Sequence, residues 1–246
     1  MSTGDRKGSR GGTASGKGGG ARDLKVEVKR SRKLSHSSQL WLRRQLNDPY
    51  VKRAKEAGYR SRAAFKLSEM DDKVKFLKPG QRLIDLGCAP GGWCQVAGER
   101  IGAKSGKGKV IGIDLLAVDP VPGAEIIQMD FMDEAAPERL KELLNGPADG
   151  VMSDMAANTT GHKKTDHLKI IGLAEAALEF AYEVLSPGGF FLVKLFQGGE
   201  SAALLNQLKR DFTVVRNLKP AASRADSSEL YVLATGYRRT GAPPQP

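Results

Sequence analysis

The stretch LIDLGCAPGGW, residues 83–93, passes from an apolar segment into a turn built from small residues. Asp85 ends the predicted strand, Gly87, Gly91 and Gly92 form the turn, and a helix is predicted to follow. A cluster of glycines indicates a backbone that turns sharply or approaches a ligand closely. A nicotinamide-binding turn would read G-x-G-x-x-G, and a phosphate loop would contain Gly-Lys-Ser or Gly-Lys-Thr. This turn has neither pattern, which excludes a dehydrogenase of that type.

Downstream of this turn, short apolar segments alternate with helical stretches. Such alternation is typical of a mostly parallel sheet covered by helices on both faces. The connection at 219–228 has no helical period, so we expect the final strand to run antiparallel. The predicted fold class is α/β, a Rossmann-like, doubly wound, mostly parallel seven-stranded sheet with one antiparallel strand. Strands are predicted at 82–85, 109–114, 125–129, 150–153, 189–196, 213–218 and 230–235, and helices at 92–101, 136–144, 166–185 and 201–210.

The positive charge of the chain is concentrated near its N-terminus. The 246 residues have a formal net charge of +11. Residues 1–66 hold 18 Lys/Arg and 5 Asp/Glu, a net charge of +13, and the remainder has a net charge of −2. Such asymmetry indicates a polyanionic partner, most often a nucleic acid. The alternative is a solubilising tail that binds nothing specific, which we favour for residues 1–21 taken alone.

Composition also divides the chain into segments. The Gly-, Ser- and basic-rich start predicts a disordered tail. After it, Asn47 or Asp48 can cap a helix, Gly58 can end it and Ser61 can start another. We therefore predict a basic tail at 1–35 and a single domain at 36–240, with RNA-facing helices at 36–80 and the Rossmann-like core at 81–240.

The sequence has no apolar run near the roughly 20 residues that cross a bilayer. It also lacks the apolar core of a secretory signal. We expect a cytoplasmic, monomeric protein without membrane contact. Cys88 and Cys94 are expected to be reduced and packed, and the three histidines (His36, His162 and His167) indicate no metal site.

Carboxylates follow several predicted strands at what should be one edge of the sheet. A single acidic strand end is usually a helix cap or a turn former. Several together would repel one another unless cations or hydroxyl groups share the space. A ligand with ribose hydroxyls, an exocyclic amine and a positive charge fits this edge, and S-adenosylmethionine has all three and no phosphate. On this hypothesis Asp114 binds the ribose hydroxyls, Asp130 the adenine amine, and Gly87 and Gly91 let the backbone approach, while Trp93 either closes the pocket or packs the first helical turn. The four carboxylates are Asp85, Asp114, Asp130 and Asp154.

A second group of charged residues is predicted near the same edge. Lys194 interrupts the apolar stretch GFFLVKLFQGG, where an unpaired charge would cost several kcal/mol, so it is expected to be paired or to lie at the strand end. Asp154 ends the adjacent strand, and Glu229 begins the antiparallel one, which places it beside Lys194. Lys66 comes from the basic helix that precedes the first strand. For any one of these residues alone, a buried ion pair without chemistry is the better interpretation.

Six blocks in order, YRSRAAFKL, DLGCAPGGW, DLL, SDMAANTTG, LVKLFQG and SSELYVLATG, resemble the FtsJ/RrmJ (RlmE) family of ribose 2′-O-methyltransferases. The resemblance covers about residues 47–236. It implies S-adenosylmethionine-dependent methylation of a uridine ribose in 23S ribosomal RNA of the large subunit. It also implies a catalytic tetrad at Lys66, Asp154, Lys194 and Glu229 and cofactor contacts at Gly91, Trp93, Asp114, Asp130 and Asp154. Ala157 stands where the family has proline, which loosens a substrate-side loop but removes no functional group.

Two mechanisms remain open from the sequence. Most of the catalysis should come from aligning the hydroxyl with the methyl donor. An ordinary lysine is protonated at neutral pH. Lys194 therefore either is made a base by its surroundings or stays a cation that orients the hydroxyl and stabilises its developing charge. Alternative functions are methylation of transfer RNA or another RNA, or RNA binding without catalysis.

Overall fold

The computed structural model describes residues 1, 39, 42–43, 45–156, 162–197, 201–224 and 227–238. Apart from Met1, the predicted disordered tail lies outside these residues, as does Ala157. The chain divides into two compact units, Met1–Asn47 and Asp48–Pro246. The second unit holds every helix and strand named below, and in the described part of the chain no helix is long and apolar enough to span a membrane.

A seven-stranded sheet forms the centre of the second unit, with the strand order β3-β2-β1-β4-β5-β7-β6. β3, β2, β1, β4 and β5 run parallel to one another, whereas β7 runs antiparallel to both of its neighbours. The predicted fold class and the antiparallel final strand are therefore confirmed. The strands are β1 Arg82–Leu86, β2 Lys109–Asp114, β3 Ala124–Gln128, β4 Ala148–Ser153, β5 Leu185–Phe196, β6 Phe212–Leu218 and β7 Glu229–Tyr237.

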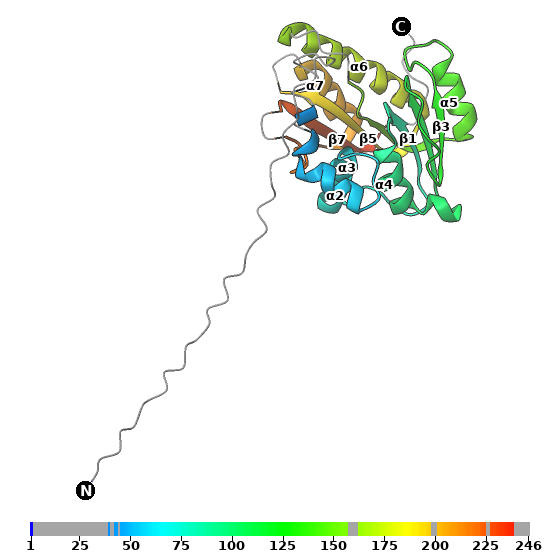
Figure 1. The fold of residues 1–246 in the computed structure, drawn as a ribbon. Helices are drawn as coiled ribbons and strands as arrows, with labels where there is room; N and C mark the ends of the chain where they lie inside the picture. Colours follow the sequence, from blue (N-terminus) through cyan, green and yellow to red (C-terminus); the bar gives the residue numbers. More distant parts are fainter. Residues whose placement is uncertain are drawn as a thin grey trace. The chain divides into compact units, whose positions relative to one another are not determined.

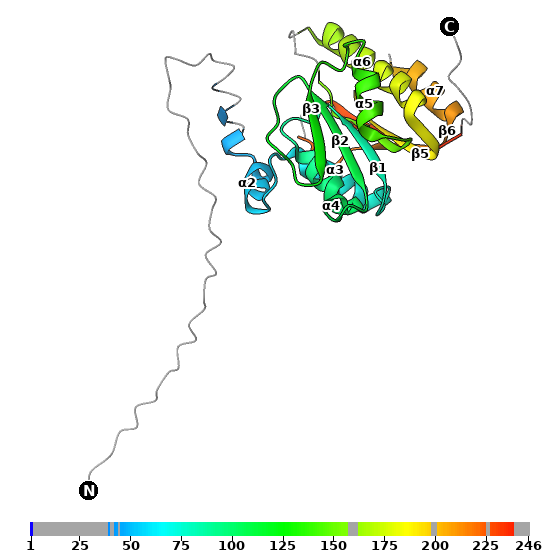
Figure 2. The ribbon, with the colours of Figure 1, turned by 90° about the vertical axis from the view of Figure 1, so that its right-hand side faces the viewer.

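Helices cover both faces of this sheet (Figures 1 and 2). α3 and α4 pack on one face, and their buried side chains form one apolar core with Leu83, Val110 and Leu233. α5, α6 and α7 pack on the other face around Ile84, Ile111 and other apolar strand residues. The helices are α2 Pro49–Glu56, α3 Ala63–Val74, α4 Gly92–Ile101, α5 Ala136–Leu144, α6 Lys163–Val184 and α7 Ala202–Asp211, with a short 3-10 helix, η1, at Ala103–Ser105.

The start of the second unit follows the helix signals in the sequence. The Asp48 side chain caps α2 by accepting a hydrogen bond from the Tyr50 backbone N–H at 3.0 Å. Pro49 occupies the first turn, where its missing N–H leaves no donor unpaired. α3 then presents Ala64, Leu67 and Met70 to the core. This packing fixes the first turn of α3, which carries Lys66, against the sheet.

The strand order reverses between β1 and β4, which lie side by side although two α-helices, the 3-10 helix η1 and two strands separate them in sequence. In open α/β sheets, ligands bind beyond the carboxyl ends of the strands at such a reversal. The residues that follow β1, β2, β3 and β4 therefore meet at one edge, which we call the carboxyl edge.

Candidate active site

A cavity of about 440 Å³ opens at the carboxyl edge. Carboxylates from three strand ends line it, namely Asp114, Asp130 and Asp154. Apolar side chains supply most of the remaining wall. Leu115, Leu116, Met132 and Leu173 are among them, and the first three are also among the most exposed large apolar side chains of the described residues. Acceptor oxygens set in an apolar wall suit a ligand with hydroxyl or amine donors and a flat apolar ring.

Two of these carboxylates also shape the loops that bear them. Asp114 accepts hydrogen bonds from the Ala89 N–H at 2.8 Å and from the Leu116 N–H at 2.9 Å. Asp130 accepts one from the Met132 N–H at 2.9 Å. Each carboxylate oxygen has a second lone pair, so the contacts that fix these side chains do not prevent them from accepting a ligand's donors.

The glycine turn lies against the same cavity. Gly87 lines the cavity and has a φ of 77°, in the left-handed region. A Cβ there would come within 2.8 Å of Met155 Cγ and 2.9 Å of its Cα. Glycine is therefore needed for the backbone conformation and for close packing against the segment that follows β4. Gly91 has a φ of 102°, and its Cβ would meet Val121 Cγ2 at 2.8 Å.

Two residues predicted to contact the cofactor do not line the cavity. Gly91 caps the start of α4. Trp93 is only 2% exposed, and its indole N–H donates to the Ala63 carbonyl at 2.9 Å. Trp93 therefore packs the first turn of α4 against Ala63 at the start of α3.

Asp85 differs from the expectation that it ends its strand beside the other acidic residues. It lies within β1, is 0% exposed and lines no part of the cavity. Cys94 Sγ lies 3.1 Å from its Oδ2, while Oδ1 has no hydrogen-bond partner among the described residues. Burial raises the pKa of Asp85 to about 7; the contact with Cys94 opposes this shift, and the charges of Asp154 and Asp114 add to it. The sequence missed this because β1 continues one residue beyond Asp85.

The four predicted tetrad residues lie together as two ion pairs. Lys194 Nζ lies 2.9 Å from Asp154 Oδ1 and donates to the Asp154 carbonyl at 2.5 Å. Lys66 Nζ lies 2.8 Å from Glu229 Oε1 and 3.0 Å from its Oε2. Lys194 is 8% exposed, so its charge is largely buried and is paired, as its apolar strand required.

The placement of Glu229 beside Lys194 was wrong in its detail. Glu229 is opposite Phe196 in the register of β5 and β7, and its ionic partner is Lys66. The residue opposite Lys194 is Tyr231. The antiparallel direction of β7 could be predicted from the sequence. Its register with β5 could not, because the register depends on how the side chains of the two strands pack together.

Tyr231 joins the two ion pairs, and sequence reasoning missed it. Its hydroxyl lies 3.1 Å from Lys66 Nζ and 2.8 Å from Asp154 Oδ1. In the block SSELYVLATG, Tyr231 stands two residues after Glu229, and the period of two along a strand puts both on one face. This spacing could have indicated that Tyr231 lies near the ionic cluster. It was overlooked because an aromatic residue in an apolar strand is usually a core residue.

Asp154 belongs to both the cavity and the ionic cluster. Burial alone would raise the pKa of its carboxyl, but the ammonium charges of Lys194 and Lys66 and hydrogen bonds from Lys194 and Tyr231 outweigh burial. The pKa of Asp154 is therefore below its ordinary value. The residue stays a carboxylate at neutral pH and can hold a cation at the boundary between the cavity and the cluster.

The aromatic residues of the N-terminal helices pack on one another. The Phe65 ring lies 5.6 Å from the rings of both Tyr50 and Tyr59, and the Arg53 guanidinium lies 4.7 Å from the Phe65 ring centroid. Arg60 donates to the carbonyls of Pro90, Asp119 and Pro120. Phe65 therefore packs among the side chains of the N-terminal helices.

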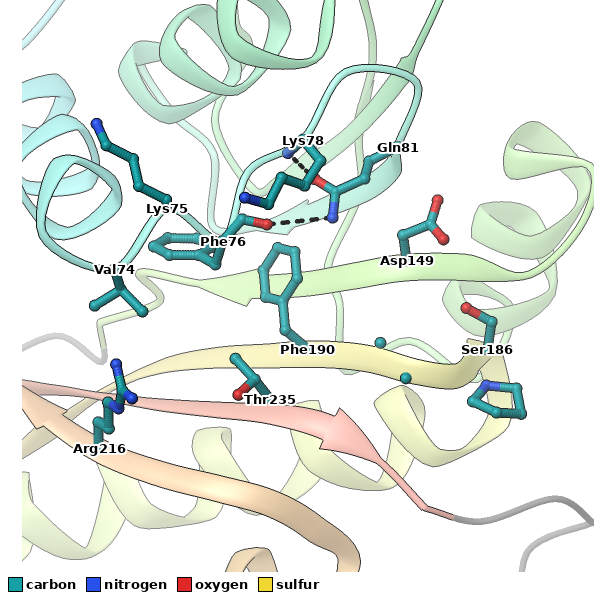
Figure 3. A pocket seen from close by; sticks show the side chains of 13 residues that line it. Val74, Lys75, Phe76, Lys78, Gln81, Asp149, Ser186, Phe190, Arg216 and Thr235 are labelled. Carbon is teal, nitrogen blue, oxygen red and sulfur yellow. Dashed lines mark hydrogen bonds between the residues drawn. The ribbon is translucent and has the colours of Figure 1, made fainter.

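A second cavity, of about 490 Å³, lies at the opposite edge of the sheet (Figure 3). The rings of Phe76 and Phe190 meet there with centroids 5.0 Å apart. Lys78 and Arg216 also line it. None of the predicted cofactor or tetrad residues line it. The cavity at the carboxyl edge, which several of them line, is therefore the candidate active site.

Comparison with known proteins gives a family. The model of the family described as "FtsJ-like methyltransferase" matches residues 59–237. A protein of Xanthobacter autotrophicus named "Ribosomal RNA large subunit methyltransferase E" is 64% identical over 222 residues, which span 90% of this chain and 87% of that one. A protein of the same name from Azorhizobium caulinodans is 65% identical over 218 residues, with 89% and 91% coverage. A solved ribosomal RNA methyltransferase from Plasmodium falciparum has a TM-score of 0.64 and 36% identity, and the match covers 73% of this chain and 98% of that one.

Proposed function

The chain belongs to the FtsJ-like methyltransferase family, and from this premise we propose that it uses S-adenosylmethionine to methylate the 2′-hydroxyl of a uridine ribose in 23S ribosomal RNA, as part of the large ribosomal subunit. The relatives' names support ribosomal RNA as the substrate. The ribose 2′-position, the uridine and the cofactor rest on the chemistry of the site and on the resemblance of the sequence blocks.

One observation carries the proposal: Asp154 lines the cavity and also forms an ion pair with the buried ammonium group of Lys194. A methyl donor in the cavity and a hydroxyl beside Lys194 would therefore be neighbours. Bringing two reactants into such contact accounts for much of the rate of a transfer reaction.

The residues present fit S-adenosylmethionine, which when bound supplies a methyl group on a positively charged sulfur. Asp114 ends β2 and would accept from the ribose hydroxyls, and Asp130 would accept from the adenine amine. The apolar side chains of Leu115, Leu116 and Met132 offer surface to the adenine ring. Asp154 offers a negative charge to the positive sulfur. The cavity volume lies within the range of roughly 300–1,000 Å³ that is usual for small-molecule sites.

Lys194 is the residue we assign to the reacting hydroxyl. An ammonium has three N–H donors, and Asp154 takes two of them through its carboxylate and its carbonyl. The third can donate to the O2′ oxygen of the substrate. Held in this way, Lys194 would orient the hydroxyl and stabilise the negative charge that develops on O2′. The O2′ proton would be released to solvent water.

The charge of the chain supports an RNA substrate. Residues 1–66 have a net charge of +13, and positive groups release condensed counterions when they neutralise phosphates. The described residues of this segment include Arg53 on α2 and Lys66 on α3, so basic side chains continue to the reaction site. An enzyme of ribosomal RNA would work in the cytoplasm.

The proposal is tested by supplying S-adenosylmethionine with a labelled methyl group and three RNAs separately. These are large subunits from cells that lack the corresponding methyltransferase, naked 23S RNA, and total transfer RNA. We expect label in the large subunits, and nuclease digestion with mass spectrometry should recover it as 2′-O-methyluridine. Label in transfer RNA alone would favour the alternative substrate. Cofactor binding without label in any RNA would favour a non-catalytic RNA-binding protein.

A further inference from the structure

The Tyr231 hydroxyl occupies the centre of the ionic cluster. Its side chain is 0% exposed. Lys66 Nζ lies 3.1 Å from the hydroxyl on one side, and Asp154 Oδ1 lies 2.8 Å from it on the other. Through these two hydrogen bonds the phenol links the Lys66–Glu229 pair to the Asp154–Lys194 pair.

The direction of each hydrogen bond follows from the proton count. A phenol has one proton to donate, and an ionised carboxylate can only accept. Tyr231 therefore donates to Asp154 and accepts from Lys66. Burial, followed by the negative charges of Asp154 and Glu229, raises the pKa of Tyr231 well above its ordinary value. The phenol consequently keeps its proton, and both hydrogen bonds persist at neutral pH.

All three N–H donors of Lys66 have acceptors in this arrangement. Two face the oxygens of Glu229, at 2.8 and 3.0 Å, and the third faces the Tyr231 oxygen. If the phenol oxygen were absent, the third donor would be drawn to the Asp154 carboxylate, the other negative group with which the charge of Lys66 interacts. The oxygen of that group that Tyr231 contacts, Oδ1, is also the one that lies beside Lys194.

The position of the phenol oxygen is fixed by the fold. Tyr231 is opposite Lys194 in the pairing of β5 with β7 and opposite Leu218 in the pairing of β7 with β6. The Trp93 ring packs against the tyrosine ring with centroids 5.7 Å apart. Because neighbouring strands and a buried indole hold the ring, its oxygen can act as a rigid spacer.

We propose that Tyr231 is a positioning residue for the methyl transfer: its hydroxyl keeps Lys66 on Glu229 and away from Asp154 Oδ1, the oxygen that Tyr231 shares with Lys194, so that Lys194 points at the reacting hydroxyl. The inference rests on the proposed function for its chemical meaning. It adds a fifth side chain to the tetrad, one that acts through Asp154 and Lys66 rather than by touching the substrate.

The first test compares Tyr231→Phe with Tyr237→Phe in the full-length protein. Tyr237 is a buried tyrosine on the same strand, 4% exposed, and lies in the core on the opposite face of the sheet. With saturating S-adenosylmethionine and large subunits, we expect the single-turnover rate of Tyr231→Phe to fall about 10- to 100-fold, the usual effect of losing a hydrogen bond to a charged group. Its cofactor Kd and its KM for subunits should change by less than about twofold. A wild-type rate in Tyr231→Phe, or an equal loss in Tyr237→Phe, would overturn the proposal.

A second measurement does not depend on activity. In protein labelled with ¹⁵N lysine and ¹³C aspartate, NMR reports the Nζ signals of Lys66 and Lys194 and the titration of the Asp154 carboxyl. Tyr231→Phe should shift both Nζ signals and raise the pKa of Asp154, because one donor to its carboxylate is lost. Tyr237→Phe should leave all three unchanged. If the wild-type protein methylates no RNA, the proposed function fails, while these signals still decide whether Tyr231 spaces the two ion pairs. Unchanged signals in Tyr231→Phe would refute the spacer.

Discussion

Lys194 places a positive charge in a strand that is otherwise apolar, and its contacts limit the directions in which its ammonium group can donate hydrogen bonds. Two of its donors are taken by Asp154, and its side chain is largely buried. Such a group has one direction left for donation. Its location beside the cavity, rather than its charge alone, makes it the residue on which the proposed chemistry depends.

We therefore predict that Lys194→Ala lowers the single-turnover rate by roughly 10²- to 10³-fold, the loss typical of one removed oxyanion donor. Cofactor affinity should stay within a few-fold, because Asp114 and Asp130 are unchanged. Isothermal titration with S-adenosylhomocysteine and a rapid-quench assay measure the two quantities. Lys78→Ala, in the cavity at the opposite edge, is the control and should keep the wild-type rate. An active Lys194→Ala variant would remove the assignment.

Asp85 leads to a prediction about stability. Its pKa of about 7 is above the ordinary value of 3.8, so between these pH values the folded state keeps the proton that the unfolded state releases. The contribution of Asp85 to the free energy of unfolding is therefore largest at low pH and falls as the pH rises to about 7. Above that pH it does not change further. In Asp85→Asn this titration is absent.

The unfolding free energy of Asp85→Asn relative to wild type should consequently rise between pH 4 and pH 7, by up to roughly 4 kcal/mol. Urea unfolding at several pH values measures the difference, and a constant offset between the two proteins cancels from the slope. A difference that does not change with pH would show that Asp85 is ionised in the folded protein.

At the residue scale, the sequence predicted well which residues lie at the carboxyl edge. It predicted less well which of them form ion pairs and hydrogen bonds with one another. Asp114, Asp130 and Asp154 could be placed there because strand ends can be read from apolar runs. The Lys66–Glu229 pairing and the bridging role of Tyr231 could not, because they depend on the β5–β7 register and on the position of α3.

At the scale of elements, the turn from β1 to α4 decides the shape of the cavity. Gly87 holds a left-handed conformation while the backbone of Met155 passes directly beside it. The bounds of the helix follow from the sequence, since α4 was predicted at its observed residues, whereas β1 runs one residue beyond its predicted end. The close approach of the segments that follow β1 and β4 was not predicted, because it joins parts of the chain that are far apart in sequence.

Gly87→Ala should therefore destabilise the protein and weaken cofactor binding. The left-handed conformation alone costs about 1–2 kcal/mol for a residue with a Cβ, and contact with the Met155 backbone adds to this. Gly106→Ala is the matched control, since Gly106 has a similar φ of 72° but no described atom lies within 4 Å of the place its Cβ would take. Denaturant unfolding should show the larger loss for Gly87→Ala, and cofactor titration should show a loss for it alone. Equal losses in the two variants would mean that Met155 moves aside easily.

At the scale of the whole molecule, the chain combines a near-neutral core with a strongly basic N-terminal part. The fold class could be predicted from the alternation of elements, and the mostly parallel sheet was then confirmed. The role inferred for residues 1–35 rests on their composition alone. A basic segment without periodicity indicates the type of partner that it binds but does not predict a structure.

Deletion of residues 1–35 should weaken RNA binding and make it less dependent on salt. This segment contains ten Lys/Arg, and each lost phosphate contact reduces the slope of log affinity against log salt by roughly 0.7–0.9. The rate at saturating RNA should not change, since the ionic cluster begins at Lys66. Binding measured across a series of salt concentrations gives the slope. An unchanged slope would show that the segment contributes nothing to RNA affinity.

The central claim is that one cavity holds the methyl donor beside the Lys66–Glu229 and Asp154–Lys194 pairs, and a crystal structure of the complex with S-adenosylhomocysteine tests it most directly. We predict ribose hydroxyls on Asp114, the adenine amine on Asp130, and the sulfur facing Asp154 and Lys194. A ligand bound in the cavity beside Phe76 and Phe190, or one at the carboxyl edge with its sulfur turned away from Lys194, would contradict it.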